Sequence, residues 1–492
     1  MEPSQSAARS AASDALSTVS SFWDIVPNPR GGSVPSAERA LTSAIDDFES
    51  GADAAAPLIL AANALRAAGW ASALRFAEAL IFALPQATHS GENRALFGIA
   101  LRDFRAAIAR HNLWEVACSY ALFSHYQALR AMLSDQPERA VASISLDELV
   151  LAGRPVPPAL LDPEFDESQL AHWRARYEQA LLAVLRASDT EPADAALDVF
   201  ESCFAALTGA DPYDAWRLAG GVLKGLRTVG RACDPEAKRL YARFNMLLAE
   251  QARGAKVAPA AIARAAVALL WRGFALHGPA AGDADAIELL RDYGLSINWF
   301  SGPESTERSL WDADATARLQ ALEPPLGLTA IPPEMPGVTP SRQSLRGIGA
   351  LRVHVLVYED FLQTADAAIS ALTIYAAANP RPGKPDASAA LQAGDAAYQL
   401  GAAASAVGLG GVATLADALG LAWRRVAHAA AGSATAVATN SRTLENGAEA
   451  LRRMLHQVAA GIAPADPAAA LADLITLIES DRRASGVLPA WH

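Results

Sequence analysis

Apolar residues recur at helical spacing along most of the chain, and this periodicity limits the fold more than any other feature of the sequence. Leu74, Ala77, Leu80 and Leu84, for example, would share one face of a helix. The chain is 52% hydrophobic, and much of that fraction is Ala, which favours helices but has little surface to bury. We therefore predict an all-α fold of closely approaching helices without a thick aromatic core.

Proline-rich stretches divide this helical pattern into units. A length of 492 residues is enough for about three domains. The apolar pattern and the turns of the second unit predict four or five antiparallel helices with short turns, which is typical of an up-and-down bundle. The predicted organisation is a disordered tail at 1–35, a helical unit at 36–144, a linker at 145–167, a bundle at 168–300, a Pro-rich linker at 301–345 and a bundle at 346–492.

Charge and cysteine content favour a soluble cytoplasmic protein. The net charge is −12, which argues against a nucleic-acid surface or an anionic-membrane surface. Cys118, Cys203 and Cys233 form no CxxC motif and are predicted to be buried thiols in a reducing compartment. The chain shows no basic start followed by an apolar run, so we expect no signal peptide, and no stretch is apolar enough to predict membrane insertion.

The sequence shows no motif for catalysis or for binding a cofactor. Its nine histidines do not cluster, and no HExxH or Cys/His set indicates a metal site. The glycines at 408–411 lie between two helical patterns and predict a turn rather than a phosphate loop. We therefore expect no catalytic residue, no cofactor and no metal.

Residues 398–420 predict the end of one helix, a glycine turn and the start of a second helix. This stretch resembles the histidine phosphotransfer (Hpt) bundle, in which His-x-Leu-Lys-Gly-(Ser)-Ala-x-x-Val-Gly-Leu carries a phosphorylated histidine. The frame is kept at Leu400 and at Val407-Gly-Leu409. However, Tyr398 stands at the histidine position and Gly401 at the lysine position.

The second unit repeats the same frame in residues 216–222. Trp216 takes the histidine position, Ala219 takes the lysine position, and Gly220 keeps the glycine. A weaker alignment in the first unit places the histidine position near Ile59. The chain is therefore predicted to contain tandem four- or five-helix bundles of degenerate Hpt type joined by Pro-rich linkers.

The order of these pieces resembles the type IV pilus regulator FimL and the related N-terminal region of the chemosensory kinase ChpA. The matching segments are residues 215–226, 236–248, 263–277 and 400–415, within a resemblance over roughly residues 40–480. It implies a non-catalytic adaptor in chemosensory signalling that controls type IV pili and twitching motility. The implied partners are a response-regulator receiver protein and a polar hub protein, with recruitment to the cell pole.

The substituted positions decide which function the degenerate bundles can keep. Phosphotransfer needs a neutral imidazole as nucleophile and a nearby cation. A phenol with an ordinary pKa near 10 and an indole are poor substitutes, so we expect no phosphorelay through these helices. Small residues beside each aromatic ring instead suggest a partner-binding patch, although the rings could equally be core residues. The candidate partner-binding residues are Trp216, Ala219, Gly220, Tyr398, Gly401, Ala402 and Ser405.

Two alternatives stay open. His428 is followed by Gly432-Ser-Ala434, which copies the spacing His-x-x-x-Gly-Ser-Ala, although this stretch lacks the lysine. The chain could therefore be an active phosphotransfer protein that uses His428 or another histidine. It could also be a helical scaffold unrelated to chemosensing.

Overall fold

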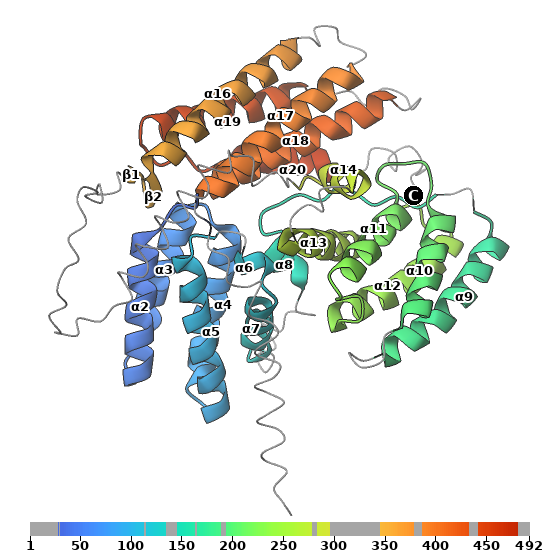
Figure 1. Cartoon of the computed structure of the whole chain (residues 1–492), viewed down its shortest axis with the longest axis horizontal. Coiled ribbons are helices and arrows are strands. Elements are labelled where there is room, and N and C mark those ends of the chain that lie inside the picture. Colours follow the sequence, from blue (N-terminus) through green and yellow to red (C-terminus); the bar gives the residue numbers. More distant parts are fainter. Residues whose placement is uncertain are drawn as a thin grey trace, which may run out of the picture.

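A computed structural model describes the fold of residues 28, 30–112, 115–133, 145–162, 165–187, 193–277, 283–295, 345–377, 386–431 and 441–480. Within these ranges the chain is helical apart from one two-stranded hairpin, which confirms the all-α prediction. Most of the predicted tail 1–35 and of the predicted linker 301–345 lies outside the described residues. The helices form three bundles (Figure 1).

The first bundle is a ring of four helices with three shorter helices on its α4–α5 side. The ring consists of α2 (Pro35–Ser50), α3 (Ala55–Ala67), α4 (Ala71–Ala87) and α5 (Gly91–Ala109), and the shorter helices are α6 (Glu115–Cys118), α7 (Tyr120–Ala131) and α8 (Leu146–Val150). Phe76 links the four helices to α7. The centroid of its aromatic ring lies 4.6 Å from that of Phe104 on α5 and 6.2 Å from that of Tyr126 on α7.

The second bundle closes five helices into a ring, with one shorter helix beside it. They are α9 (Glu167–Arg186), α10 (Asp194–Leu207), α11 (Ala215–Thr228), α12 (Pro235–Ala252), α13 (Ala260–His277) and α14 (Ala284–Asp292). Its core contains a connected aromatic cluster, so our expectation of no thick aromatic core is wrong for this bundle. The cluster consists of Tyr177, Phe200, Phe204, Trp216, Tyr241 and Phe244.

The third bundle begins with a short antiparallel hairpin and continues with five helices. The elements are β1 (Leu345–Ile348), β2 (Leu351–His354), α16 (Val355–Ala377), α17 (Ala387–Val407), α18 (Gly410–Ala431), α19 (Ser441–Ala459) and α20 (Ala468–Glu479). Helix α17 ends at Val407 and is capped by Gly408, which has a left-handed φ of 103° that favours glycine. The helix–turn–helix that we predicted at this point is therefore present.

The third bundle lies across the first and second bundles (Figure 1). Helix α8 of the first bundle and helix α13 of the second bundle meet where these two bundles adjoin. Residues 159–161, which belong to the segment 145–167 that we predicted as a connector, are packed against the second bundle. The amides of Leu160 and Leu161 donate to the carbonyls of Tyr213 and Lys256, at 2.8 and 2.9 Å. Ala258 returns a bond to the carbonyl of Ala159 at 2.8 Å. These bonds satisfy backbone groups that burial would otherwise leave unpaired, so this segment forms a fixed part of the domain junction.

Candidate functional site

Tyr398, on the face of α17 that we predicted as a partner-binding patch, has a buried aromatic ring. Tyr398 is 3% exposed, and its hydroxyl donates a hydrogen bond of 2.6 Å to the carbonyl oxygen of Arg291, in the last turn of α14 of the second bundle. Burial raises the pKa of this phenol well above its ordinary value. Of the two positions that we left open for this ring, at a partner-binding face or in the core, the structure shows the second, because the chain itself covers this face.

The small residues around Tyr398 bring α17 and α18 close together. A Cβ atom added at Gly401 would lie 2.9 Å from the carboxyl carbon of Asp417 on α18. A Cβ at Gly420 would lie 2.6 Å from the ring of Tyr398. Ala402 is buried and Ser405 is half-buried. Glycine is thus required here for helix packing, whereas partner binding by Gly401, Ala402 and Ser405 stays a prediction.

The corresponding face of α11 is also in the core. Trp216 has no exposed surface, and its indole nitrogen donates to the side-chain oxygen of Gln251 at 2.9 Å. Ala219 is buried and Gly220 is half-buried. The indole belongs to the aromatic cluster of the second bundle, with its ring centroid 6.0 Å from that of Phe204. Trp216 is therefore a core residue, which is the second of the two possibilities that we left open for this ring.

A buried carboxylate joins the second bundle to the third. Asp292, at the end of α14, accepts hydrogen bonds from Arg217 at 2.8 Å, from Arg424 at 3.1 and 3.2 Å, and from His428 at 2.9 Å. Burial would raise the pKa of Asp292, but the hydrogen bonds from His428 and Arg217 and the charge of Arg424 outweigh it and hold the pKa below its ordinary value. This cluster is an ionised clamp between two bundles.

His428 is therefore part of the clamp. It lies in the last turn of α18, and its imidazole packs edge-on against the ring of Tyr213, with centroids 5.7 Å apart. Its Nε2 atom faces the buried carboxylate of Asp292. The Gly-Ser-Ala segment at 432–434, which prompted the phosphotransfer alternative, lies outside the described residues.

Buried polar side chains also join the other bundles. Arg154, after α8, pairs with Asp417 of α18 at 2.6 Å. Arg272 of α13 is buried, donates at 3.2 Å to the carbonyl of Cys118 and stacks over the ring of Tyr120 at 3.8 Å. The indole nitrogen of Trp70 donates to the carbonyl of Gly408 at 2.8 Å. These contacts fix all three bundles to one another.

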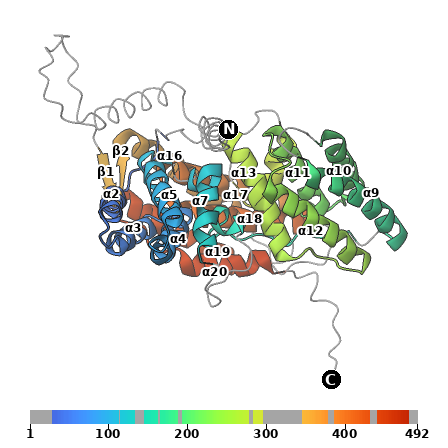
Figure 2. The ribbon, with the colours of Figure 1, turned by 90° about the horizontal axis from the view of Figure 1, so that it is seen from below.

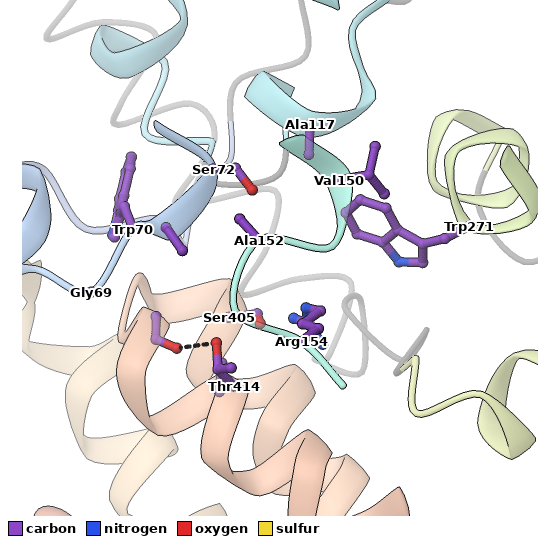
Figure 3. Close-up of a pocket in the computed structure, with 13 residues that line it drawn as sticks. Gly69, Trp70, Ser72, Ala117, Val150, Ala152, Arg154, Trp271, Ser405 and Thr414 are labelled. Atoms are coloured by element: carbon purple, nitrogen blue, oxygen red, sulfur yellow. Dashed lines mark hydrogen bonds between the residues drawn. The ribbon is translucent and has the colours of Figure 1, made fainter. Parts of the chain in front are cut away.

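One small hollow lies where the three bundles meet (Figure 3). It has a volume of about 80 Å³, which is room for a few water molecules. Trp271 and Arg154 line one side, and Ser405 and Thr414 line another. Arg154 is already paired with Asp417, so the hollow has no uncompensated charge from this side chain.

Our sequence analysis missed the charged residues at these junctions, although the sequence carries a signal for them. Asp417, Arg272 and Arg424 each interrupt an apolar helical run. A charge at a core position is expensive unless it is paired, so such an interruption indicates a partner on another element. The sequence does not say which element supplies that partner.

Among the described residues, no group of three or more His, Cys, Asp and Glu side chains could hold a metal ion. None of the described helices is both long enough and apolar enough to cross a membrane.

Comparison with known families identifies the second bundle. Residues 162–296, which span α9 to α14, match the family model described as the second domain of the FimL scaffold protein. This bundle is therefore similar to a FimL scaffold domain. No curated protein and no solved structure matches the chain. The FimL resemblance is thus confirmed for this domain, while the relationships to ChpA and to Hpt bundles stay predictions.

Proposed function

We propose that this FimL-like protein is a non-catalytic scaffold in the chemosensory signalling that controls type IV pili and twitching motility. It would act in the cytoplasm, with recruitment to the cell pole, and bind a response-regulator receiver protein or a polar hub protein. The match of the second bundle to the FimL scaffold domain carries this proposal. The sequence resemblance at residues 400–415 of the third bundle is consistent with it.

The contacts between the bundles suit a scaffold. Buried ion pairs and hydrogen bonds hold the three bundles in one arrangement, through Asp292, Asp417, Arg272 and Trp70. Such contacts have strict geometry, and removing one partner leaves a buried charge or donor unsatisfied. A partner would therefore meet surfaces whose relative positions are already set.

The buried aromatic residues argue against phosphotransfer at the two degenerate positions. A phosphoryl donor must reach the accepting atom in line, yet Tyr398 and Trp216 are enclosed by the chain. His428 is the alternative acceptor, and its Nε2 is engaged by Asp292. We expect no phosphoryl transfer from a receiver domain to any of these residues.

Two experiments test the proposal. In the first, the purified chain is incubated with a ³²P-labelled receiver domain, and we expect no acid-labile label on it. Stoichiometric acid-labile label that disappears in His428→Gln would establish the phosphotransfer alternative instead.

In the second, the coding sequence is deleted in the cell that carries it, and twitching zones and surface pili are measured. We expect both to change and re-expression to restore them. Unchanged pili and motility in the deletion strain would contradict a role in pilus control.

A further inference from the structure

The residues just before α2 are fixed along the β1–β2 hairpin. The amide of Ser33 donates to the carbonyl of Arg352 on β2 at 2.8 Å, and the amide of Arg352 returns a bond to the carbonyl of Ser33 at 2.8 Å. The two segments run antiparallel at this bridge. The chain that precedes Ser33 therefore leads along β2 toward His354 and the start of α16.

Contacts of Arg30 and Asn28 continue this path. The Nη1 atom of Arg30 lies 3.8 Å from Oδ2 of Asp360, in the second turn of α16. The amide of Asn28 donates to the carbonyl of Arg110 at 3.1 Å, and its side chain donates to that of Ala406 at 3.0 Å. The residues before Asn28 are therefore attached to the molecule at the place where the hairpin and α16 meet the first bundle.

Two large leucines are exposed at the same place. Leu345 on β1 is 53% exposed and Leu356 on α16 is 57% exposed. Leu345 is paired with His354 in the register of the β1–β2 hairpin, so their side chains share one face of it. The imidazole of His354 accepts a hydrogen bond of 3.3 Å from the amide of Leu356. We call these three residues the β1–α16 patch. Figure 2 shows the β1–β2 hairpin at the edge of the molecule, beside α16.

The sequence just before Asn28 contains an apolar segment that can reach this patch. Residues 22–26 are Phe-Trp-Asp-Ile-Val, and they include the only two aromatic residues before Asn28. Leu356 precedes Asp360, the partner of Arg30, by about 6 Å along the axis of α16. An extended chain spans about 3.3 Å per residue, so residues 22–26 can extend up to about 20 Å from Asn28.

Charge and attachment favour this segment over a separate molecule. Asp24 is its one charged residue. The exposed Arg352 offers a cation on the face of the β1–β2 hairpin that carries Leu345, because its Nη1 atom lies 3.5 Å from the point where a Cβ on Gly347 would be. A segment joined to its site by a short linker has an effective concentration in the millimolar range, which favours it over a free molecule.

We propose that residues 22–26 bind the β1–α16 patch. Phe22 and Trp23 would cover Leu345 and Leu356, and Asp24 would face Arg352. This contact would extend the one that Ser33 and Arg30 already make with β2 and α16. A partner protein could then reach the patch only after it had displaced the segment. The inference concerns the chain alone and does not depend on the pilus function.

The test uses the full chain with a photoreactive side chain in the segment. Trp23→p-benzoylphenylalanine keeps a large aromatic group, and ultraviolet light joins its benzophenone to a carbon–hydrogen bond that it touches. We expect mass spectrometry of the monomer to place the cross-link within residues 345–356. Cross-links only to other segments, or no cross-link, would overturn the proposal.

Patch variants locate the contact. In the photoreactive chain, Leu345→Ser with Leu356→Ser should lower the yield of the cross-link at least fivefold. The matched control is Ile374→Ser, because Ile374 is 65% exposed on the same helix. It lies about 27 Å along α16 from Leu356, so its substitution should leave the yield unchanged. Circular dichroism checks that both variants fold, and an undiminished yield in the patch variant would contradict the proposal.

Gel electrophoresis separates a second copy as the occupant. A cross-linked dimer as the main product would mean that residues 22–26 bind another copy of the chain, and would also overturn the proposal. These measurements need no pilus phenotype. An unchanged deletion strain would therefore refute the pilus function alone, and a failed cross-linking experiment would refute the binding of this segment alone.

Discussion

The α17–α18 hairpin and the α9–α12 pair are both antiparallel pairs of helices, yet they use their apolar residues in opposite ways. In the hairpin, alanines and glycines let the helices approach closely, and the first two bundles cover the pair. On α9 and α12, two leucines and a methionine are instead exposed to solvent. The helix pair whose sequence suggested a docking face is thus part of the interior.

The difference shows which residues report an open surface. Small residues beside an aromatic ring are equally compatible with a docking site and with tight intramolecular packing, because both need close backbone approach. Large apolar residues on the solvent side of a helix have no role in the core and point to an outside partner more directly.

The largest effect should come from Gly401→Arg in the hairpin. We expect it to lower the free energy of unfolding by about 4 kcal/mol or more, because a side chain at 401 has no space beside Asp417 and forces the helices apart. Urea denaturation followed by circular dichroism measures the loss. This reverses the expectation for an exposed face, on which folding would survive the substitution.

The matched control is Gly91→Ala at the start of α5, where an added Cβ meets nothing within 4 Å. Its free energy of unfolding should change by no more than about 0.5 kcal/mol. A small effect of Gly401→Arg, similar to that of the control, would show that the hairpin is open after all.

Asp292→Asn should have the next largest effect. We expect a loss of about 3 kcal/mol in the free energy of unfolding, since the buried Arg424 and its neighbours lose their shared negative charge. Asp366→Asn, at an exposed position on α16, serves as the control and should change little. An Asp292→Asn protein as stable as the wild type would mean that the clamp does not hold the two bundles together.

The same clamp predicts a pH dependence. The folded state holds the pKa of Asp292 below its ordinary value, so the unfolded state binds the proton more tightly. The stabilisation is therefore fully present above about pH 4 and is lost as the pH falls through the lower, folded-state pKa. Urea midpoints of wild type and Asp292→Asn should converge as the pH falls below about 4, and a gap that stays constant down to pH 3 would contradict this.

The smallest effect should be that of Leu182→Ser with Met246→Ser on stability. Both side chains are mostly exposed, so we expect each substitution to change the free energy of unfolding by no more than about 0.5 kcal/mol. Thermal unfolding is the measurement. A loss of several kcal/mol would show that these residues support the core, and would remove the contrast with the hairpin.

The sequence predicted individual helices better than it predicted the contacts between them. Helical periodicity located most helices, and the glycines located the turn at Gly408. However, residues 55–84, which are periodic throughout, divide at a turn with Gly69 at a φ of 76°. The β1–β2 hairpin, only four residues a strand, gave no alternating signal long enough to recognise.

The exposure of the candidate site residues was harder to predict, because the burial of Tyr398 and Trp216 depends on contacts with other helices. Tyr398 is covered by a segment 107 residues away, and Trp216 bonds Gln251 across the second bundle. Helical spacing shows which residues share a face, but not which element packs against that face. The partners of Asp292 likewise come from two bundles.

The bond from Trp70 to Gly408 has a consequence for the order of events during synthesis. The two residues are 338 positions apart, and Asn28 bonds Ala406 across 378 positions. At roughly 5–20 residues per second, the ribosome needs roughly 20–70 s to supply the acceptor after the donor has been made. During that time the indole nitrogen of Trp70 and the surface around it stay uncovered in the nascent first bundle. Chaperones that bind unfinished chains would therefore bind the protein at this surface.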